Sequence, residues 1–160
     1  MGPIEKLTQL QWDCYTECRK ESARKMATII VDMDGTLALK GERNPYDWHK
    51  VGEDLPNLPV VWTIQRLQVF STVLVVSGRD EVCRWQTEMW LTAHGILFHD
   101  LFMRAHKDNR PDHEIKREIY LEKLQPYFPN IVAVFDDRQQ CCALWRHLGL
   151  PCFQVADGSF

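Results

Sequence analysis

The chain has 160 residues, of which 45% are hydrophobic and 26% are charged, and its formal net charge is −3 at pH 7. This composition is typical of one globular domain with a buried core, and it excludes a protein-wide basic field for nucleic acid, although it allows a local basic patch. The sequence lacks both an apolar run of membrane-spanning length and a signal-like N-terminus, so we expect a cytoplasmic protein.

Residues 4–25 are predicted to form an amphipathic helix, because apolar side chains recur there at near-helical spacing with charges between them. These apolar residues are Ile4, Leu7, Leu10, Cys14 and Cys18. We treat residues 1–26 as an N-terminal helical extension that precedes the domain of residues 27–160. The helix is expected to pack on the domain edge. A contact between two copies of the chain and the remnant of a fused module are the alternatives.

The apolar run of residues 27–31 is predicted to be a buried strand, and it leads directly into Asp-Met-Asp-Gly-Thr at residues 32–36. Successive side chains of a strand point to opposite faces, so Asp32 and Asp34 can serve one site only if the chain bends after the strand. Gly35 permits that bend. Two crowded carboxylates need a cation or a shared proton, so the motif predicts a Mg²⁺ site with a carboxylate nucleophile. A strand that simply ends in a polar turn is the alternative.

Beyond a polar loop of residues 37–58, helices and strands are predicted to alternate. The predicted helices span residues 60–70, 81–94, 114–124 and 139–148. The predicted strands span residues 72–76, 96–103, 131–135 and 152–155. This alternation predicts an α/β fold, a three-layer, Rossmann-like arrangement in which helices cover both faces of a parallel sheet.

The helix predicted over residues 81–94 carries apolar side chains at helical offsets, which we assign to the core rather than to a base-stacking platform. They are Val82, Trp85, Met89, Trp90 and Ala93. Gly95 is expected to end this helix. The six cysteines include no Cys-x-x-Cys pair and no zinc-type spacing, so reduced thiols used as small apolar residues are expected. A cross-link between chains through Cys14 and Cys18 is the alternative.

Polar groups that suit phosphate chemistry follow two more of the predicted strands. Ser-Gly-Arg at residues 77–79 follows the strand of residues 72–76, and Asp-Asp-Arg at 136–138 follows the strand of 131–135. A helical segment between them holds Lys116. Ligands of open α/β sheets bind outside the carboxyl ends of the strands, so these groups and the Asp-x-Asp motif are expected to form one site.

In content and order, these motifs resemble the haloacid dehalogenase-like phosphatase superfamily over residues 27–155. A closer resemblance, which reaches the C-terminus, is to the 3′-phosphatase domain of phage polynucleotide kinase–phosphatases. The segments that carry it are residues 31–38, 44–47, 75–79, 115–119, 136–138 and 152–158. Members of the superfamily often select substrates with an inserted cap domain. The gaps between the motifs of this chain are too short for a large one, so we expect a minimal cap or none.

The resemblance implies a role for each central residue. Asp32 would attack phosphorus and form an aspartyl-phosphate. Asp34 would protonate the leaving oxygen and later act as base on the hydrolytic water. Ser77 would bind a phosphoryl oxygen. Lys116, preferred to Lys107 because its surroundings match the phage enzyme, would neutralise the nucleophile and the transferred phosphate.

The resemblance also implies a metal site and a set of substrate contacts. Asp32, the backbone carbonyl of Asp34 and Asp136 would bind Mg²⁺, and Asp137 would bind it directly or orient its waters. The residues expected to contact the substrate are Gly35, Thr36, Gly78, Arg79, Arg43, Arg104 and Arg138. Guanidinium groups suit phosphate recognition, although each of the four arginines has a solvated or structural role as its alternative.

The leading hypothesis is a Mg²⁺-dependent phosphomonoesterase that removes 3′-phosphates from polynucleotide ends or from nucleoside 3′-phosphates. An open site without a large cap suits a nucleic-acid end. A small-molecule phosphatase, such as a nucleotidase or sugar phosphatase, and a non-catalytic binding module are the alternatives. The sequence contains no Gly-x-x-x-x-Gly-Lys-Ser/Thr phosphate loop, so kinase activity is not expected.

Overall fold

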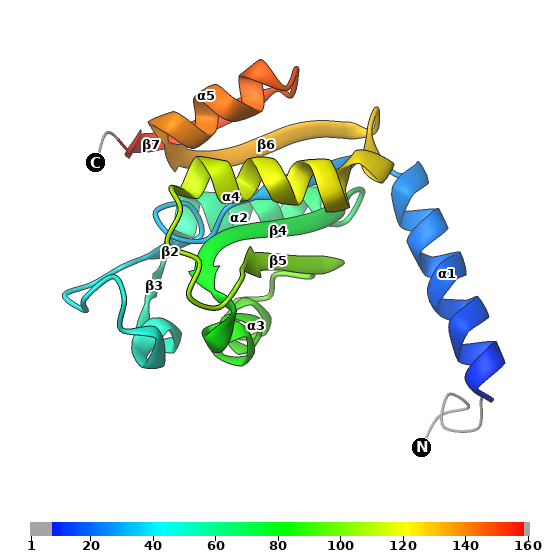
Figure 1. The fold of residues 1–160 in the computed structure, drawn as a ribbon, viewed down its shortest axis with the longest axis horizontal. Coiled ribbons are helices and arrows are strands. Elements are labelled where there is room, and N and C mark those ends of the chain that lie inside the picture. Colours follow the sequence, from blue (N-terminus) through cyan, green and yellow to red (C-terminus); the bar gives the residue numbers. More distant parts are fainter. Residues whose placement is uncertain (1–7, 159–160) are drawn as a thin grey trace.

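A five-stranded parallel sheet forms the centre of the computed structural model, which describes residues 8–158 (Figure 1). The strand order is β5-β4-β1-β6-β7, so the first strand in the chain lies in the middle of the sheet. The strands are β1 (Thr28–Val31), β4 (Thr72–Asp80), β5 (Asp100–Arg104), β6 (Ile131–Arg138) and β7 (Cys152–Gly158). All four pairings are parallel, as the predicted alternation of strands and helices requires.

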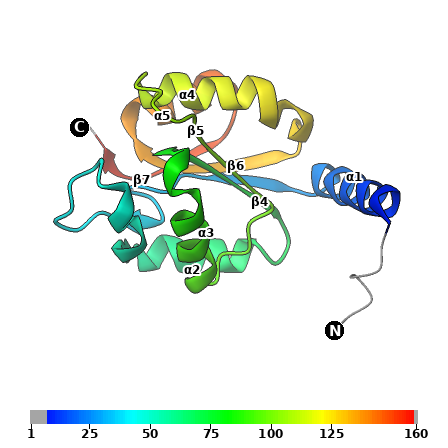
Figure 2. The ribbon, with the colours of Figure 1, turned by 60° about the horizontal axis from the view of Figure 1, so that its bottom comes forward.

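Helices cover both faces of this sheet, which confirms the predicted three-layer α/β fold. The helices are α1 (Gln9–Lys25), α2 (Leu58–Leu67), α3 (Arg84–Ala93), α4 (Asp112–Ile119) and α5 (Gln139–His147). Short helical turns are η2 (Trp48–Glu53), η3 (Glu81–Cys83), η4 (Tyr120–Leu124) and η5 (Gln125–Tyr127). Figure 2 shows α2 and α3 on one face of the sheet and α4 and α5 on the other.

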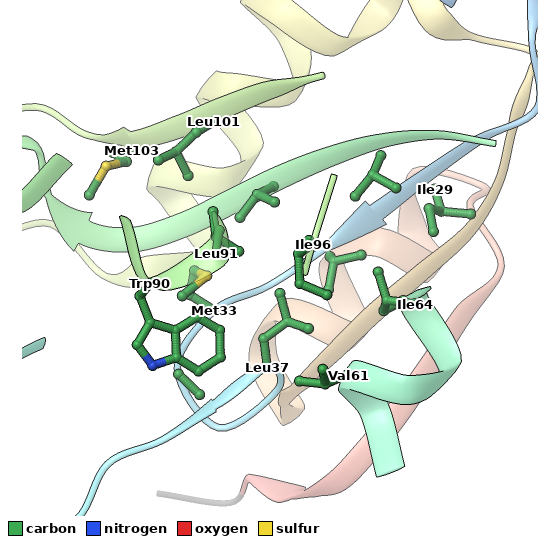
Figure 3. Packing of buried hydrophobic residues seen from close by; sticks show 14 of the residues in the cluster. Ile29, Met33, Leu37, Val61, Ile64, Trp90, Leu91, Ile96, Leu101 and Met103 are labelled. Carbon is green, nitrogen blue, oxygen red and sulfur yellow. The ribbon is translucent and has the colours of Figure 1, made fainter. Parts of the chain in front are cut away.

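The central strand supplies both halves of the core because its side chains alternate between the two faces. Ile29 and Val31 belong to the cluster beneath α2 and α3, part of which Figure 3 shows, and Ile30 belongs to the cluster beneath α4 and α5. All four residues of β1 are buried. A continuous apolar run is typical of a parallel strand covered on both faces, so the sequence could identify this strand.

Helix α1 departs from the packing expected of it. Ala23 is its buried residue, whereas Trp12 and Tyr15 are 38% and 45% exposed. The helix extends away from the sheet in Figure 1, and its last turn is tied to the domain where Thr72 Oγ1 donates to the Ala23 carbonyl. Its few apolar side chains are too sparse to hold a longer contact. Ile4 and Leu7 lie outside the described residues, and the dimer contact stays a prediction.

Helix α3 turns a different face to the core than its periodicity predicted. Trp90 is buried, but Val82, Trp85 and Met89 are 54%, 68% and 49% exposed, and Ala93 is also exposed. The buried residues of α3 are Thr87, Trp90 and Leu91, so its buried face includes a threonine, which a search for apolar side chains passes over. Gly95 ends the helix with φ of +67°, as predicted.

The cysteines behave as small apolar residues, as expected. Each of the six is a free thiol, and Cys83, Cys141 and Cys142 are buried. Cys14 and Cys18 lie exposed on α1, so the alternative of a cross-link between chains stays a prediction. Among residues 8–158, no helix is both long and apolar enough to span a membrane.

The segment predicted as a loop over residues 37–58 contains a small antiparallel pair of strands. They are β2 (Ala38–Leu39) and β3 (Leu55–Pro56), and η2 lies between them and packs against α3. This insertion is far smaller than a domain, which confirms the expectation of a minimal cap. It extends beyond the carboxyl ends of the central strands, where it borders the candidate site (Figure 1).

Candidate active site

One buried lysine joins three carboxylates at the carboxyl ends of the central strands. Lys116 on α4 places its Nζ 2.7 Å from Asp32 Oδ1, 2.8 Å from Asp136 Oδ2 and 3.5 Å from Asp112 Oδ2. The structure therefore brings together three of the residues singled out in the sequence. The competing candidate, Lys107, is exposed, and its backbone N–H donates to Asp80 Oδ2.

Burial and charge oppose each other at this cluster. Burial alone would lower the pKa of Lys116, but Asp136, Asp32 and Asp112 outweigh it and raise that pKa well above its usual range. Burial raises the pKa of Asp32 well above its usual range, against the attraction of Lys116. Because Asp32 is costly to ionise in this setting, positive charge beside it favours the carboxylate form that a nucleophile needs.

Three carboxylates form a set of oxygen donors that fits a divalent cation. One oxygen each from Asp32, Asp136 and Asp137 lies within 4.8 Å of the others, and all three residues are buried. Oxygen donors of this kind suit Mg²⁺. The side chain of Asp34 is not in this group, since it faces two arginines, so its predicted contribution is through its backbone carbonyl alone and stays a prediction.

The turn after β1 depends on Gly35, whose φ is +84°. Its N–H donates to the Ala38 carbonyl at 2.8 Å, and a Cβ at this position would collide with the Asp137 carboxylate. Thr36 is buried, and its hydroxyl lies 3.2 Å from Asp32 Oδ2 and 3.3 Å from Asp137 Oδ1. Both residues were expected to contact the substrate, and the structure shows them shaping the carboxylate cluster.

β4, which carries the Ser-Gly-Arg motif, and β6, which carries the Asp-Asp-Arg motif, are longer than predicted. β4 continues through Ser77 to Asp80, and β6 continues through Asp136 to Arg138, with an irregular register at both motifs. Ser77 is fully buried, and its Oγ accepts from the Arg79 N–H at 3.1 Å. Such irregularities re-aim side chains at a strand end, so the motifs belong to the sheet edge itself.

Two arginines hold Asp34 in place. Arg79 is fully buried, and its Nε and Nη2 donate to the two carboxylate oxygens of Asp34 at 2.8 and 2.7 Å. Arg43 Nη2 lies 3.3 Å from Asp34 Oδ1. Both guanidinium groups also bind Asp54, which is almost completely buried between them. The paired geometry fixes the orientation of the Asp34 carboxylate.

The other two predicted substrate arginines lie beside the site in different settings. Arg104 donates to the carbonyls of Gly78 and Asp108 and to Asp112 Oδ1, which holds the loop before α4 against β4. Arg138 donates its backbone N–H to Asp136 Oδ1 at 3.1 Å. The contacts of Arg104 match a structural role, which was the alternative to substrate binding for this residue.

Two acidic residues of the site were missed in the sequence. Asp54 lies in a polar segment without any spacing signal, and only the fold brings it between Arg43 and Arg79. Asp112 precedes Lys116 by four residues, and its pKa is lowered because Lys116, Arg138 and Arg104 outweigh its burial. Asp112 and Lys116 are four residues apart on one helix, and this spacing could have predicted their contact.

Replacing Arg79 with lysine is expected to lower kcat by about ten-fold or more, because an ammonium cannot make the paired contact to Asp34 and reach Asp54 as well. Steady-state phosphate release measures this effect, and Arg66→Lys on the exposed face of α2 is the matched control. Unchanged kcat in Arg79→Lys would show that the orientation of Asp34 does not depend on the guanidinium.

Asp80 anchors the loop that leads to α4, and its replacement by asparagine is expected to cost about 1–2 kcal/mol of unfolding free energy. Its carboxylate accepts from the N–H groups of Val82 and Lys107 and from His106 Nδ1. Burial opposes these contacts, but together they lower the pKa of Asp80. The stabilisation is present above the pKa of Asp80 in the unfolded chain and is lost as pH falls through its folded pKa.

Urea unfolding at several pH values tests the Asp80→Asn variant, with the exposed Asp157→Asn as its control. The deficit of Asp80→Asn should be full at neutral pH and should shrink below about pH 4. A deficit that does not change with pH would assign the effect to packing rather than to the charge.

Comparison with known proteins gives a consistent set of relatives. Residues 26–160 match the family described as the polynucleotide kinase PNKP phosphatase domain. A putative bifunctional polynucleotide kinase/RNA ligase of Autographa californica nuclear polyhedrosis virus is 31% identical over 127 residues, which are 77% of this chain and 18% of that protein. The chain thus spans less than a fifth of this relative.

Solved structures agree with this assignment. A chain of the Pnkp1/Rnl/Hen1 complex superposes with a TM-score of 0.79 at 38% identity, covering 85% of this chain and 48% of that chain. The D,D-heptose 1,7-bisphosphate phosphatase from B. bronchiseptica, complexed with magnesium and phosphate, gives 0.58 at 17% identity and covers 83% of each chain. The second likeness concerns the fold alone.

Proposed function

The chain belongs to the family of polynucleotide kinase PNKP phosphatase domains and is a phosphatase, and from this premise we propose that it removes 3′-phosphates from polynucleotide ends or nucleoside 3′-phosphates with the help of Mg²⁺. The observation that carries the proposal is the position of Asp32. It is buried, it lies 2.7 Å from the Lys116 ammonium, and it forms the carboxylate cluster together with Asp136 and Asp137, while Asp34 stands two residues further along the chain.

Two steps account for the reaction. In the first, an oxygen of Asp32 bonds to phosphorus while the bond from phosphorus to the nucleoside oxygen breaks, and Asp34, which enters this step as the protonated carboxylic acid, gives that oxygen its proton and becomes a carboxylate. In the second, Asp34 takes a proton from water as the water oxygen bonds to phosphorus. The bond to Asp32 then breaks, which releases phosphate and restores the carboxylate.

The surrounding residues position and balance these charges. Lys116 offsets the charge of Asp32, and Arg79 and Arg43 keep the Asp34 carboxylate oriented. Ser77, which lies within β4 three residues before the strand ends, would bind a phosphoryl oxygen. A Mg²⁺ ion bound by Asp32, Asp136 and Asp137 would reduce the repulsion between an anionic nucleophile and an anionic phosphate.

A nucleic-acid end fits the small insertion over the site. Residues 38–56 form two short strands and a 3₁₀ turn, an insertion far smaller than a cap domain, and a site without a large cap suits a substrate that extends into solvent. The solved relative belongs to an RNA repair complex, which supports RNA ends as one substrate class for this chain.

Phosphate release from matched oligonucleotides tests the proposal. One oligonucleotide carries a 3′-phosphate, the other a 5′-phosphate, and each is measured with Mg²⁺ and with a chelator. We expect metal-dependent release that favours the 3′-phosphate. Glycerol phosphate is measured beside them as a small substrate without a base. Release from glycerol phosphate but from neither oligonucleotide would keep the phosphatase assignment and would reject the nucleic-acid substrate.

A further inference from the structure

An exposed aromatic ring stands on the insertion beside the candidate site. Tyr46 is 78% exposed, whereas its neighbour Trp48 is half-buried and packs against the core. The two rings meet edge to face, with their centroids 6.1 Å apart and their planes at 85°. Trp48 therefore supports Tyr46 from the protein side and leaves most of the tyrosine ring open to solvent.

The turn that carries Tyr46 is tied to the catalytic carboxylate through one guanidinium group. Arg43 Nη1 donates to the carbonyls of Asn44 and Pro45, each at 3.2 Å, while its Nη2 lies 3.3 Å from Asp34 Oδ1. The Tyr46 N–H donates to Asn44 Oδ1 at 3.0 Å, which closes the turn. The position of the ring is thus set by the same residue that contacts the proposed general acid.

Charge on this insertion does not explain the exposed ring. Residues 38–56 contain three lysines or arginines and four acidic residues, so the segment is not a basic track for a phosphate backbone. An aromatic side chain can bind a nucleobase without net charge, because every base has a π-face that stacks on a ring. The segment therefore suits contact with one base rather than with a length of backbone.

Resting on the proposed function, we propose that Tyr46 forms a nucleobase-stacking subsite for the nucleotide that carries the 3′-phosphate. The ring stacks on the terminal base while the phosphate reaches Asp32. The subsite makes the enzyme prefer nucleoside 3′-phosphates over phosphate esters without a base. It does not discriminate strongly among bases, since stacking is tolerant of sequence.

The test compares kcat/KM for an oligonucleotide 3′-phosphate with that for the same oligonucleotide ending in an abasic 3′-phosphate. The wild-type protein should prefer the substrate with a base by roughly ten-fold or more. In Tyr46→Ala this ratio should fall toward one, and in Tyr46→Phe it should be retained because the ring remains. Trp62→Ala, which removes a comparably exposed aromatic from α2, should keep the wild-type ratio.

Two results would overturn the subsite. If Tyr46→Ala lowers kcat/KM equally for both substrates, the residue only supports the fold of the insertion, and thermal unfolding of the variant would show that defect. If the ratio is unchanged, the base does not stack on Tyr46. A wild-type protein that hydrolyses glycerol phosphate but neither oligonucleotide would reject the proposed function itself, and that outcome is visible without any variant.

Discussion

Asp32→Asn is expected to lower phosphate release by at least about 10³-fold, a larger effect than that of Arg79→Lys. The amide has nearly the same shape as the carboxylate but cannot form the aspartyl-phosphate. Asp32 lies 2.7 Å from the Lys116 ammonium. It directly follows β1, so it stands at the carboxyl end of the central strand, where ligands of open α/β sheets bind. The neighbouring carboxylates do not replace it, because Asp136 and Asp137 are assigned to the metal and Asp34 to proton transfer.

Two readouts check this prediction. Steady-state release from an oligonucleotide 3′-phosphate should fall, and mass spectrometry after an acid quench should detect a phosphorylated peptide around residue 32 in the wild type only. Asp13→Asn, on the exposed part of α1, is the matched control and should keep full activity. More than a tenth of wild-type turnover in Asp32→Asn would reject a covalent mechanism through this residue.

The central sheet could be predicted because its strands are unambiguous in the sequence. Buried parallel strands are continuous apolar runs, and β1 and the first half of β4 fit this pattern. The ends of β4 and β6 could not be placed, because Ser77 and Asp136 are polar. Asp136 is held at the sheet edge by its contact with Lys116, and Ser77 by its strand pairing with Met103 of β5. A local pattern does not contain that information.

The errors on the helices have a similar cause. Apolar spacing indicates that one face of a helix is buried, but it does not say which face when several are partly apolar, as in α3. There the buried face is formed by Thr87, Trp90 and Leu91, so Trp90 is buried while Trp85 lies on another face and is exposed. For α1, amphipathic spacing predicted packing, but among the described residues of this helix it is Ala23 that is buried against the domain.

The candidate site shows the same division between local and tertiary information. Motif order identified Asp32, Lys116 and Asp136, which the fold assembles within hydrogen-bond distance. Motif order does not reveal the acidic residue that pairs with the arginines of the site. Asp54 becomes part of the site only when the insertion folds back and Arg43 and Arg79 meet on its carboxylate.

Lys116→Met is expected to reduce the free energy of unfolding by about 3–5 kcal/mol and to abolish turnover as well. Methionine fills a similar volume, so the loss comes from charge rather than from a cavity. Without the ammonium, Asp32 and Asp136 would lie buried near one another without the cation that both now contact at less than 3 Å. A buried charge that loses its partner costs more than an exposed ion pair contributes.

The pH dependence distinguishes this explanation from simple loss of packing. The pKa of Lys116 is raised in the folded state, so its contribution is complete below its unfolded pKa and is lost only as pH rises through the folded value. The pKa of Asp32 is also raised, so acid protonates it and relieves the repulsion in the variant. The deficit of Lys116→Met should therefore be largest from neutral to mildly alkaline pH and should shrink on acidification.

Urea unfolding across this pH range, with and without Mg²⁺, measures the effect. The exposed Lys123→Met is the control and should unfold like the wild type. Mg²⁺ should stabilise Lys116→Met more than the wild type, because the variant leaves more uncompensated negative charge at the cluster of Asp32, Asp136 and Asp137. Equal stability of Lys116→Met and wild type at neutral pH would mean that the carboxylates are already balanced without the lysine, by protonation of one of them.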